Sequence, residues 1–137
     1  FIGKPEELDF TSLSNIRITE DSPISSQAEI GYQVKSCRRR TTQEQSSACL
    51  WRRVANYIHD DITREYGEET VLLENVTEFK LRYLGTGRND DWVEQWSTMG
   101  QTEESMKGRF PLAVEITLEV KDPDPKNKDK TLRMTTV

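Results

Sequence analysis

The side chains best suited to chemistry are few in this chain of 137 residues, which has two cysteines, Cys37 and Cys49, and one histidine, His59. A structural zinc site made of cysteine and histidine needs four ligands, so three such residues cannot form one. A catalytic cysteine would need an activating context such as a helix N-terminus or a CxxC pair, and neither cysteine has one. We therefore expect no catalytic residue, no metal site and no cofactor.

The two cysteines have a second interpretation as a disulfide pair. They flank a polar stretch of eleven residues, 38–48, that separates two apolar segments. If these segments form a hairpin, the cysteines face each other at a Cα separation of about 5.5 Å, as a disulfide requires. On the chain-entropy model, closing such a loop stabilises the fold by roughly 3 kcal/mol. The alternative is two free thiols in a reducing compartment; we favour the bridge for an oxidising one.

The segment from Asp122 to Lys130 carries oxygen ligands at the short spacing that suits Ca²⁺, namely Asp122, Asp124, Asn127 and Asp129. It lacks the third acidic ligand and the glycine of an EF-hand, and it contains three lysines. An exposed hairpin loop is the favoured interpretation.

Three further polar clusters carry weaker signals. The triplet Arg38-Arg39-Arg40 could bind phosphate, and the runs 59–61 and 89–91 could bind a metal ion. A solvated loop is the favoured interpretation of all three. No phosphate-binding loop, nucleophile elbow or zinc-protease motif occurs, so an enzyme is unsupported.

Trp92 and Trp96 lie four residues apart, and paired tryptophans can stack against sugar rings. We favour a place in the core or at an interface, because tryptophan is highly buried on average. Together with Phe110 they are the candidate partner-interface residues. The alternative function is a secreted carbohydrate-binding β-sandwich that uses Trp92 and Trp96.

Composition excludes several classes of protein. Acidic residues number 24 against 19 basic ones, which gives a net charge of −5 and argues against a nucleic-acid or anionic-membrane surface. No apolar run approaches the roughly 20 residues that span a bilayer. The length fits one domain, which we assign to residues 1–137.

A period of two dominates the apolar pattern. It is clearest in residues 112–120, and it recurs in residues 28–35 and 78–83. Strict alternation predicts strands with one buried and one solvated face, typical of antiparallel sheets. Weaker strand signals cover residues 8–13, 49–54, 71–76 and 131–137. The predicted fold is mainly β, with about seven strands in two antiparallel sheets.

Helical signals are poor throughout. No window of a dozen residues carries the apolar stripe of an amphipathic helix, and we expect residues 58–69 to form a loop and residues 102–107 a short turn. The apolar face of a sheet must be covered by a second sheet or by a helix. If a helix is needed, it must lie outside residues 1–137.

Three segments, taken in order, carry a resemblance to a known family. They are Phe1-Ile2-Gly3 with residues 8–12, then residues 71–84 (VLLENVTEFKLRYL) followed by Trp92 and Trp96, then residues 110–120 (FPLAVEITLEV). This order resembles the J-type minor pseudopilin (GspJ) of the bacterial type II secretion system. The likeness runs from Phe1 to about Val120.

The resemblance implies a pilin-like α+β protein whose long N-terminal helix starts in the inner membrane and packs its second half on the sheet. Gly3 and Pro5 would stop a helix at once, so we expect residues 1–137 to be the periplasmic β-rich domain without that helix. The chain would then touch the membrane only through the missing segment. An oxidising periplasm would also favour the Cys37–Cys49 bridge.

For function, the resemblance implies assembly and not catalysis. The expected partners are the I-type and K-type minor pseudopilins, with the H-type as a further candidate. Their tip complex is thought to start and cap the filament that exports folded exoproteins. This hypothesis predicts an uncovered apolar sheet face in residues 1–137.

Overall fold

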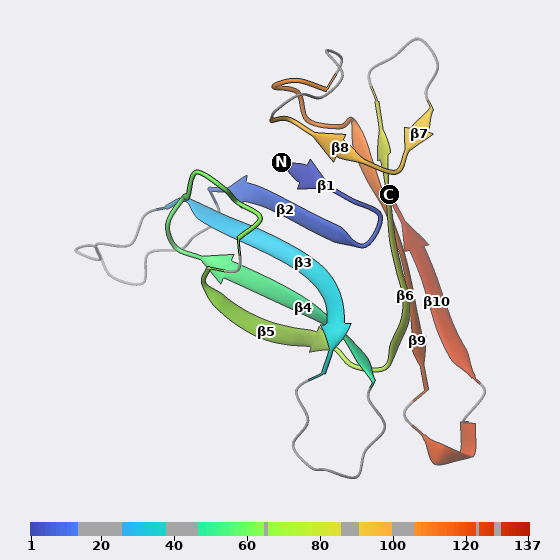
Figure 1. Ribbon diagram of the computed structural model, residues 1–137. Coiled ribbons are helices and arrows are strands. Elements are labelled where there is room, and N and C mark those ends of the chain that lie inside the picture. The colour runs from blue at the N-terminus through green and yellow to red at the C-terminus, as the bar shows by residue number, and fades with distance from the viewer. Residues whose placement is uncertain are drawn as a thin grey trace.

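The computed structural model describes residues 1–13, 26–37, 47–64, 66–85, 91–99, 106–122, 124–127 and 130–137 (Figure 1). These ranges form ten strands and one 3-10 turn. The elements are β1 (Ile2–Gly3), β2 (Glu7–Ser12), β3 (Ala28–Ser36), β4 (Ala48–Ala55), β5 (Glu68–Leu73), β6 (Val76–Leu84), β7 (Trp92–Val93), β8 (Trp96–Ser97), β9 (Ala113–Lys121), η1 (Pro125–Asn127) and β10 (Thr131–Thr136).

The strands form two sheets in which every pairing is antiparallel. Sheet A has six strands in the order β5-β4-β3-β2-β1-β8, and sheet B has four in the order β10-β9-β6-β7. Figure 1 shows sheet A on the left and the long strands of sheet B on the right. The mainly β prediction with two antiparallel sheets is confirmed. The three additional strands, β1, β7 and β8, have two residues each, which is too short for a period of two to be recognised.

The prediction of one strand over residues 71–76 is wrong in its boundaries. β5 ends at Leu73 in sheet A, and β6 begins at Val76 in sheet B. Asn75 has a φ of 58°, in the left-handed region that asparagine tolerates better than most residues. The two residues between the strands therefore turn the chain from one sheet to the other.

The core lies where β6 meets sheet A. The residues of the core cluster are Leu8, Leu50, Val76, Phe79, Leu81, Tyr83 and Trp96. Tyr83 is fully buried, and its hydroxyl donates a 2.9 Å hydrogen bond to the Lys4 carbonyl. A Cβ on Gly3 would lie 2.2 Å from the Tyr83 ring, so only glycine admits the ring so close to β1. Burial raises the pKa of the Tyr83 hydroxyl further above its ordinary value, so the hydroxyl remains a hydrogen-bond donor.

Loops follow the sequence prediction in the described ranges. Residues 56–64 form bends and turns instead of a helix, and β5 begins at Glu68 inside the predicted loop of residues 58–69. The described ranges contain no α-helix. They therefore contain no helix that is long and apolar enough to cross a membrane. The triplet Arg38-Arg39-Arg40, residues 89–90 and residues 102–105 lie outside the described residues.

We expect Leu81→Ala to lower the free energy of unfolding by about 2–5 kcal/mol, because it leaves a cavity in the fully buried centre of the core. Leu132→Ala is the matched control on the same sheet, where the side chain is 71 % exposed, and it should change stability by less than about 0.5 kcal/mol. Urea unfolding followed by tryptophan fluorescence measures both. Equal losses would contradict the placement of the core on β6.

Candidate functional site

One face of sheet B is apolar, and its side chains become more exposed to solvent from β6 through β9 to β10. The register places Phe79 of β6, Leu118 of β9 and Met134 of β10 in one row, and Val76, Val120 and Leu132 in the next. The β6 members are buried, those of β9 are half-buried, and Leu132 and Met134 are 71 % and 56 % exposed. We call this surface the open face. It consists of Val114, Ile116, Leu118, Val120, Leu132 and Met134.

Aromatic side chains of sheet A extend the same core toward solvent. Phe10 and Tyr32 are half-buried and stack at 6.3 Å between ring centroids. Phe1 packs edge-on against both Tyr83 and Phe110 at 5.9 Å. Phe110 itself is 64 % exposed, so it can contact a partner. The exposed apolar surface thus spans residues from both sheets.

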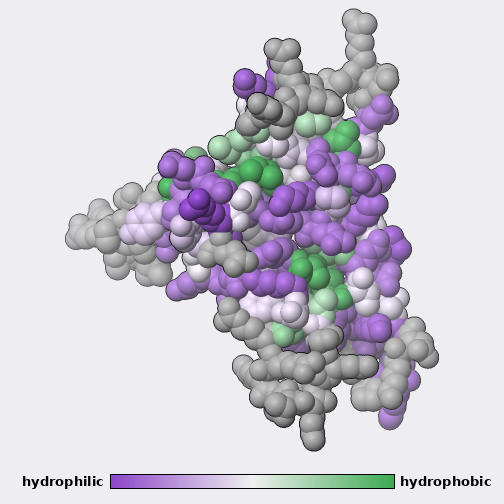
Figure 2. Space-filling model, in the orientation of Figure 1, coloured by the Kyte–Doolittle hydropathy of each residue, from purple (hydrophilic) through white to green (hydrophobic). Residues whose placement is uncertain are grey.

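The opposite face of sheet B is charged and solvated. Arg82 donates two hydrogen bonds of 2.8 Å to the Glu115 carboxylate. Arg133 lies 3.3 Å from the Glu78 carboxylate on the same face. Figure 2 shows a mostly hydrophilic surface with scattered hydrophobic patches in its view. The contrast between the two faces of sheet B identifies the apolar one as the side that packs.

The two tryptophans do not form the paired platform that was the alternative interpretation, and Trp96 lies in the core, as the favoured one has it. Trp92 belongs to β7 in sheet B and Trp96 to β8 in sheet A. Trp96 is only 2 % exposed, and its indole N–H donates a 2.8 Å hydrogen bond to the Arg109 carbonyl. Trp92 is half-buried, and the Arg82 guanidinium lies over its ring, with Arg82 Cζ 5.6 Å from the ring centroid. Trp96 therefore supports the core and presents no exposed ring face to a sugar, while the partner-interface role of Trp92 and Phe110 stays a prediction.

A buried charged cluster lies on the far face of sheet A. It centres on Arg53 of β4, which donates to the Asp9 carboxylate at 2.7 Å and lies 3.7 Å from the Glu29 carboxylate. All three residues are buried, although simple alternation predicts that such positions in strands face solvent. Burial raises the pKa of Asp9 above its ordinary value, Arg53 opposes that rise, and Glu7 adds to it.

The loop after β4 covers this cluster, and in Figure 1 it crosses over β2 and β3. Arg53 donates to the carbonyls of Ile62 and Tyr66 at 2.6 and 3.0 Å, and the Ile62 side chain is buried. His59 donates its backbone N–H to Glu29 and places its Nδ1 3.0 Å from the same carboxylate. The imidazole of His59 thus has a structural contact with Glu29, in place of the metal site that was the weaker interpretation of residues 59–61.

Cys37 and Cys49 have disulfide geometry. Their Cα atoms lie 5.1 Å apart and their sulfur atoms 1.97 Å apart. Cys49 pairs with Lys35 in the β3–β4 ladder and Cys37 follows the last pair, Ser36 and Ala48, so the bridge is diagonal across the end of the hairpin and not between directly opposite residues. The hairpin on which the sequence argument depends is present.

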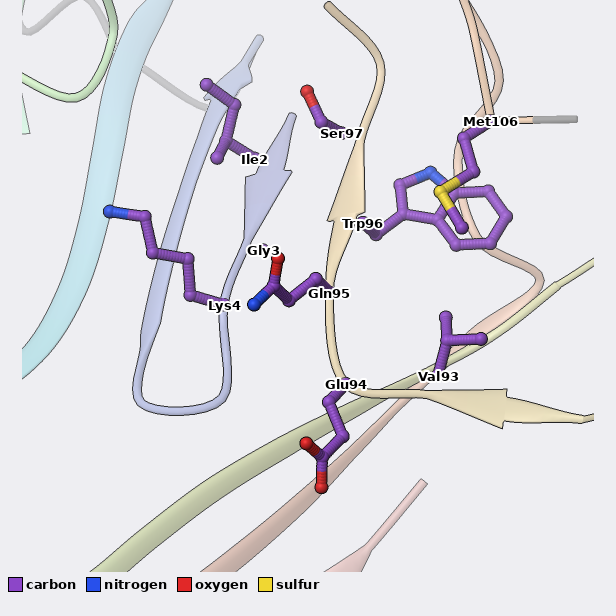
Figure 3. A pocket seen from close by; sticks show the side chains of 9 residues that line it. All are labelled: Ile2, Gly3, Lys4, Val93, Glu94, Gln95, Trp96, Ser97 and Met106. Atoms are coloured by element: carbon purple, nitrogen blue, oxygen red, sulfur yellow. The ribbon is translucent and has the colours of Figure 1, made fainter. Parts of the chain in front are cut away.

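A cavity of about 640 Å³ lies beside β1 and β8 (Figure 3). In Figure 3 Ile2 and Lys4 lie on the β1 side, while Trp96 and Met106 lie on the other. It is lined by Ile2, Gly3, Lys4, Val93, Glu94, Gln95, Trp96, Ser97 and Met106. Its lining contains one carboxylate, that of Glu94, and no histidine or cysteine. Across the described ranges no group of three or more His, Cys, Asp or Glu residues could hold a metal ion.

The acidic loop between β9 and β10 uses its oxygens internally. Asp122 accepts from the Asp124 N–H at 2.9 Å and from the Asn127 side-chain amide at 3.0 Å. Asp124 accepts from the Lys126 N–H at 2.9 Å. These bonds build a turn around Asp122 and Asp124, while Asp129 lies outside the described residues.

Comparison with known proteins identifies the family. The family model described as "Type II secretion system (T2SS), protein J" matches residues 1–127. The chain belongs to this family. A search of curated proteins finds no match.

This membership confirms the resemblance to J-type minor pseudopilins. The matched region includes every strand of both sheets except β10. The J protein is a structural component of the secretion system in the cell envelope, and other pseudopilins are its natural partners. A structural role agrees with the described residues, whose most conspicuous feature is the open face.

Sequence reasoning missed the charged cluster. Asp9, Glu29 and Arg53 each occupy a polar position of an alternating strand, which normally faces solvent. The signal that could have found them is Gly31, which pairs with both Asp9 and Arg53 across neighbouring strands. A Cβ at Gly31 would lie 2.6 Å from Asp9 Oδ1, so the glycine makes room for the ion pair.

We expect Arg53→Met to cost about 3–5 kcal/mol of unfolding free energy, because it leaves the Asp9 and Glu29 carboxylates buried without their cation. Arg64→Met, at an exposed arginine of the covering loop, is the control and should cost less than about 0.5 kcal/mol. Urea titration measures both. A loss below about 1 kcal/mol for Arg53→Met would show that the cluster contributes little to stability.

We expect the double variant Cys37→Ser/Cys49→Ser to be less stable by about 2–4 kcal/mol, because the bridge no longer restricts the unfolded chain. Wild-type protein unfolded in excess reductant should match the variant. Thiol titration of denatured protein exported to the periplasm should find no free cysteine. Two titratable thiols in that protein would contradict the bridge.

Proposed function

We propose that this chain is the periplasmic β-rich domain of a J-type minor pseudopilin and acts as a structural subunit of the pseudopilus tip complex. In that role it supports the export of folded exoproteins. The family match supports the class of protein, and the open face is the observation that carries the proposal. A subunit that works by packing needs apolar surface that its own sheets leave uncovered.

The occupant we propose for the open face is the long N-terminal helix of a pilin-like subunit, which anchors the protein in the inner membrane. The face presents aliphatic side chains on two adjacent long strands, so it can receive a helix along its length. Burying Leu132 and Met134 would contribute roughly 1.5–3 kcal/mol each. No α-helix in the described ranges supplies this cover.

The partners that follow are the I-type and K-type minor pseudopilins, with the H-type as a further candidate. Phe110 extends the exposed apolar surface at the end of the molecule where Phe1 lies. A net charge of −5 argues against a nucleic-acid partner. The disulfide geometry of Cys37 and Cys49 suits the oxidising periplasm.

The carbohydrate-binding alternative has lost its main support. It required Trp92 and Trp96 to present ring faces side by side, and they lie in different sheets with Trp96 buried. We therefore do not pursue it.

The experiment is co-purification of the full-length protein with I-type and K-type pseudopilins. We expect wild type to recover both partners and Met134→Glu to recover them at least about tenfold less, because a carboxylate on the open face would be buried unpaired. Thr131→Glu is the matched control, since it adds the same charge to the other face of β10.

Circular dichroism should show that both variants fold. If wild type recovers neither partner, the tip-complex role is wrong. If Met134→Glu and Thr131→Glu behave alike, the open face is not the packing surface.

A further inference from the structure

Arg52 of β4 is a charged residue on the side of sheet A that faces the core. Its partners on the neighbouring strands are Tyr32 of β3 and Thr70 of β5, and Tyr32 in turn pairs with Leu8 of the core cluster. Directly paired residues of neighbouring strands point to the same side of a sheet, so Arg52 shares the side of Leu8. Arg53, the next residue, points the opposite way into the buried charged cluster.

Arg52 also lies close to the open face. Leu50, two residues earlier on β4, belongs to the same buried cluster as Val76 of β6. From Val76 the apolar row continues across sheet B through Val120 to Leu132. Two residues along a strand span only about 7 Å. The long Arg52 side chain can therefore reach an element that packs against the open face and this cluster together.

The described residues provide Arg52 with no anionic partner. Its guanidinium forms no ion pair with any of them, and its Nε is a buried donor that finds no acceptor. Glu68 of β5 is the nearest carboxylate along the neighbouring strand, but it pairs with Val54 and is exposed to solvent. A buried N–H without an acceptor is costly, and native proteins rarely leave one. The atom therefore indicates an acceptor that comes from another element.

The open face has no charge that could balance this arginine, since all six of its side chains are apolar. The ion pairs of sheet B lie on the opposite face, where Arg82 contacts Glu115 and Arg133 contacts Glu78. An element that covers the apolar surface would bury Arg52 further. Such burial is strongly destabilising unless the covering element brings a negative charge.

We propose that the helix that packs on the open face carries an Asp or Glu whose carboxylate binds the Arg52 guanidinium. This inference rests on the proposed function, because it takes the N-terminal helix as the occupant. A carboxylate can accept from Nε and from a terminal N–H of arginine at once, which satisfies the buried donor. The net charge of −5 disfavours an anionic membrane as the source of the acceptor.

The ion pair would give the helix a defined position. Contacts between aliphatic side chains are non-directional and supply burial without fixing one arrangement. A two-pronged contact between a carboxylate and a guanidinium is directional, so it selects both the rotation of the helix and its position along its axis.

The test is cross-linking of the full-length protein with a carbodiimide, which joins a lysine amine to a carboxylate in direct contact. Arginine does not react in this way, so Arg52→Lys introduces the amine and keeps the positive charge. We expect mass spectrometry to find a new linked peptide between position 52 and an Asp or Glu of the N-terminal helix, within one chain. Arg133→Lys is the matched control and should link only to Glu78 or Glu119, which lie 3.3 and 3.8 Å from the Arg133 guanidinium.

Arg52→Gln should lower the Tm of the full-length protein by roughly 5 °C, because the helix carboxylate loses its cation. Arg133→Gln, the same change at a side chain that is 59 % exposed, should lower it by less than about 2 °C. Equal shifts in the two variants would contradict a buried ion pair at Arg52.

A link from position 52 to Glu68 or to a second polypeptide would overturn the proposal. The absence of any link there, while the Arg133→Lys control reacts, would overturn it as well. The comparison of Met134→Glu with Thr131→Glu tests the open face separately. If Met134→Glu alone loses its partners but position 52 forms no link to the helix, the proposed function stands and the ion pair is wrong.

Discussion

The packing of β6 against sheet A is the constraint on which the rest of the molecule depends. β6 is paired in sheet B, yet its buried side chains form one cluster with Leu8, Leu50 and Trp96 of sheet A. In sheet B burial decreases from β6 through β9 to β10, where Leu132 is exposed. Two sheets joined along one strand cannot cover each other completely. The open face is therefore a direct result of where the core lies.

The period of two predicted the long strands and the sheet class because it depends only on local alternation. It could not predict β1, β7 and β8, whose pairing depends on contacts distant in sequence. It also merged residues on either side of Asn75, since an asparagine turn of two residues leaves little trace in hydropathy. The uncovered apolar face was predictable, because strong sheet faces occurred in a chain without an amphipathic helix.

The same reasoning failed for Asp9, Glu29 and Arg53. A pattern of alternating polarity says which side chains share a face, but it does not say what a loop will later place over that face. Here the loop after β4 buries three charges, and Arg53 and Glu29 bond that loop in return. Sequence spacing also could not show that Trp92 and Trp96, four residues apart, belong to different sheets, although the favoured core position holds for Trp96.

The position of β10 at the border of sheet B has a practical consequence. All six of its residues are exposed, none is proline, and Arg133 is its only charge. An exposed edge strand of this kind can pair with a strand of another molecule, which natural proteins usually prevent with charges, prolines or a covering element. We therefore expect concentrated solutions of this chain by itself to aggregate through edge-to-edge pairing of β10. The N-terminal helix that we propose to pack on Leu132 and Met134 would protect this strand as well as support the fold.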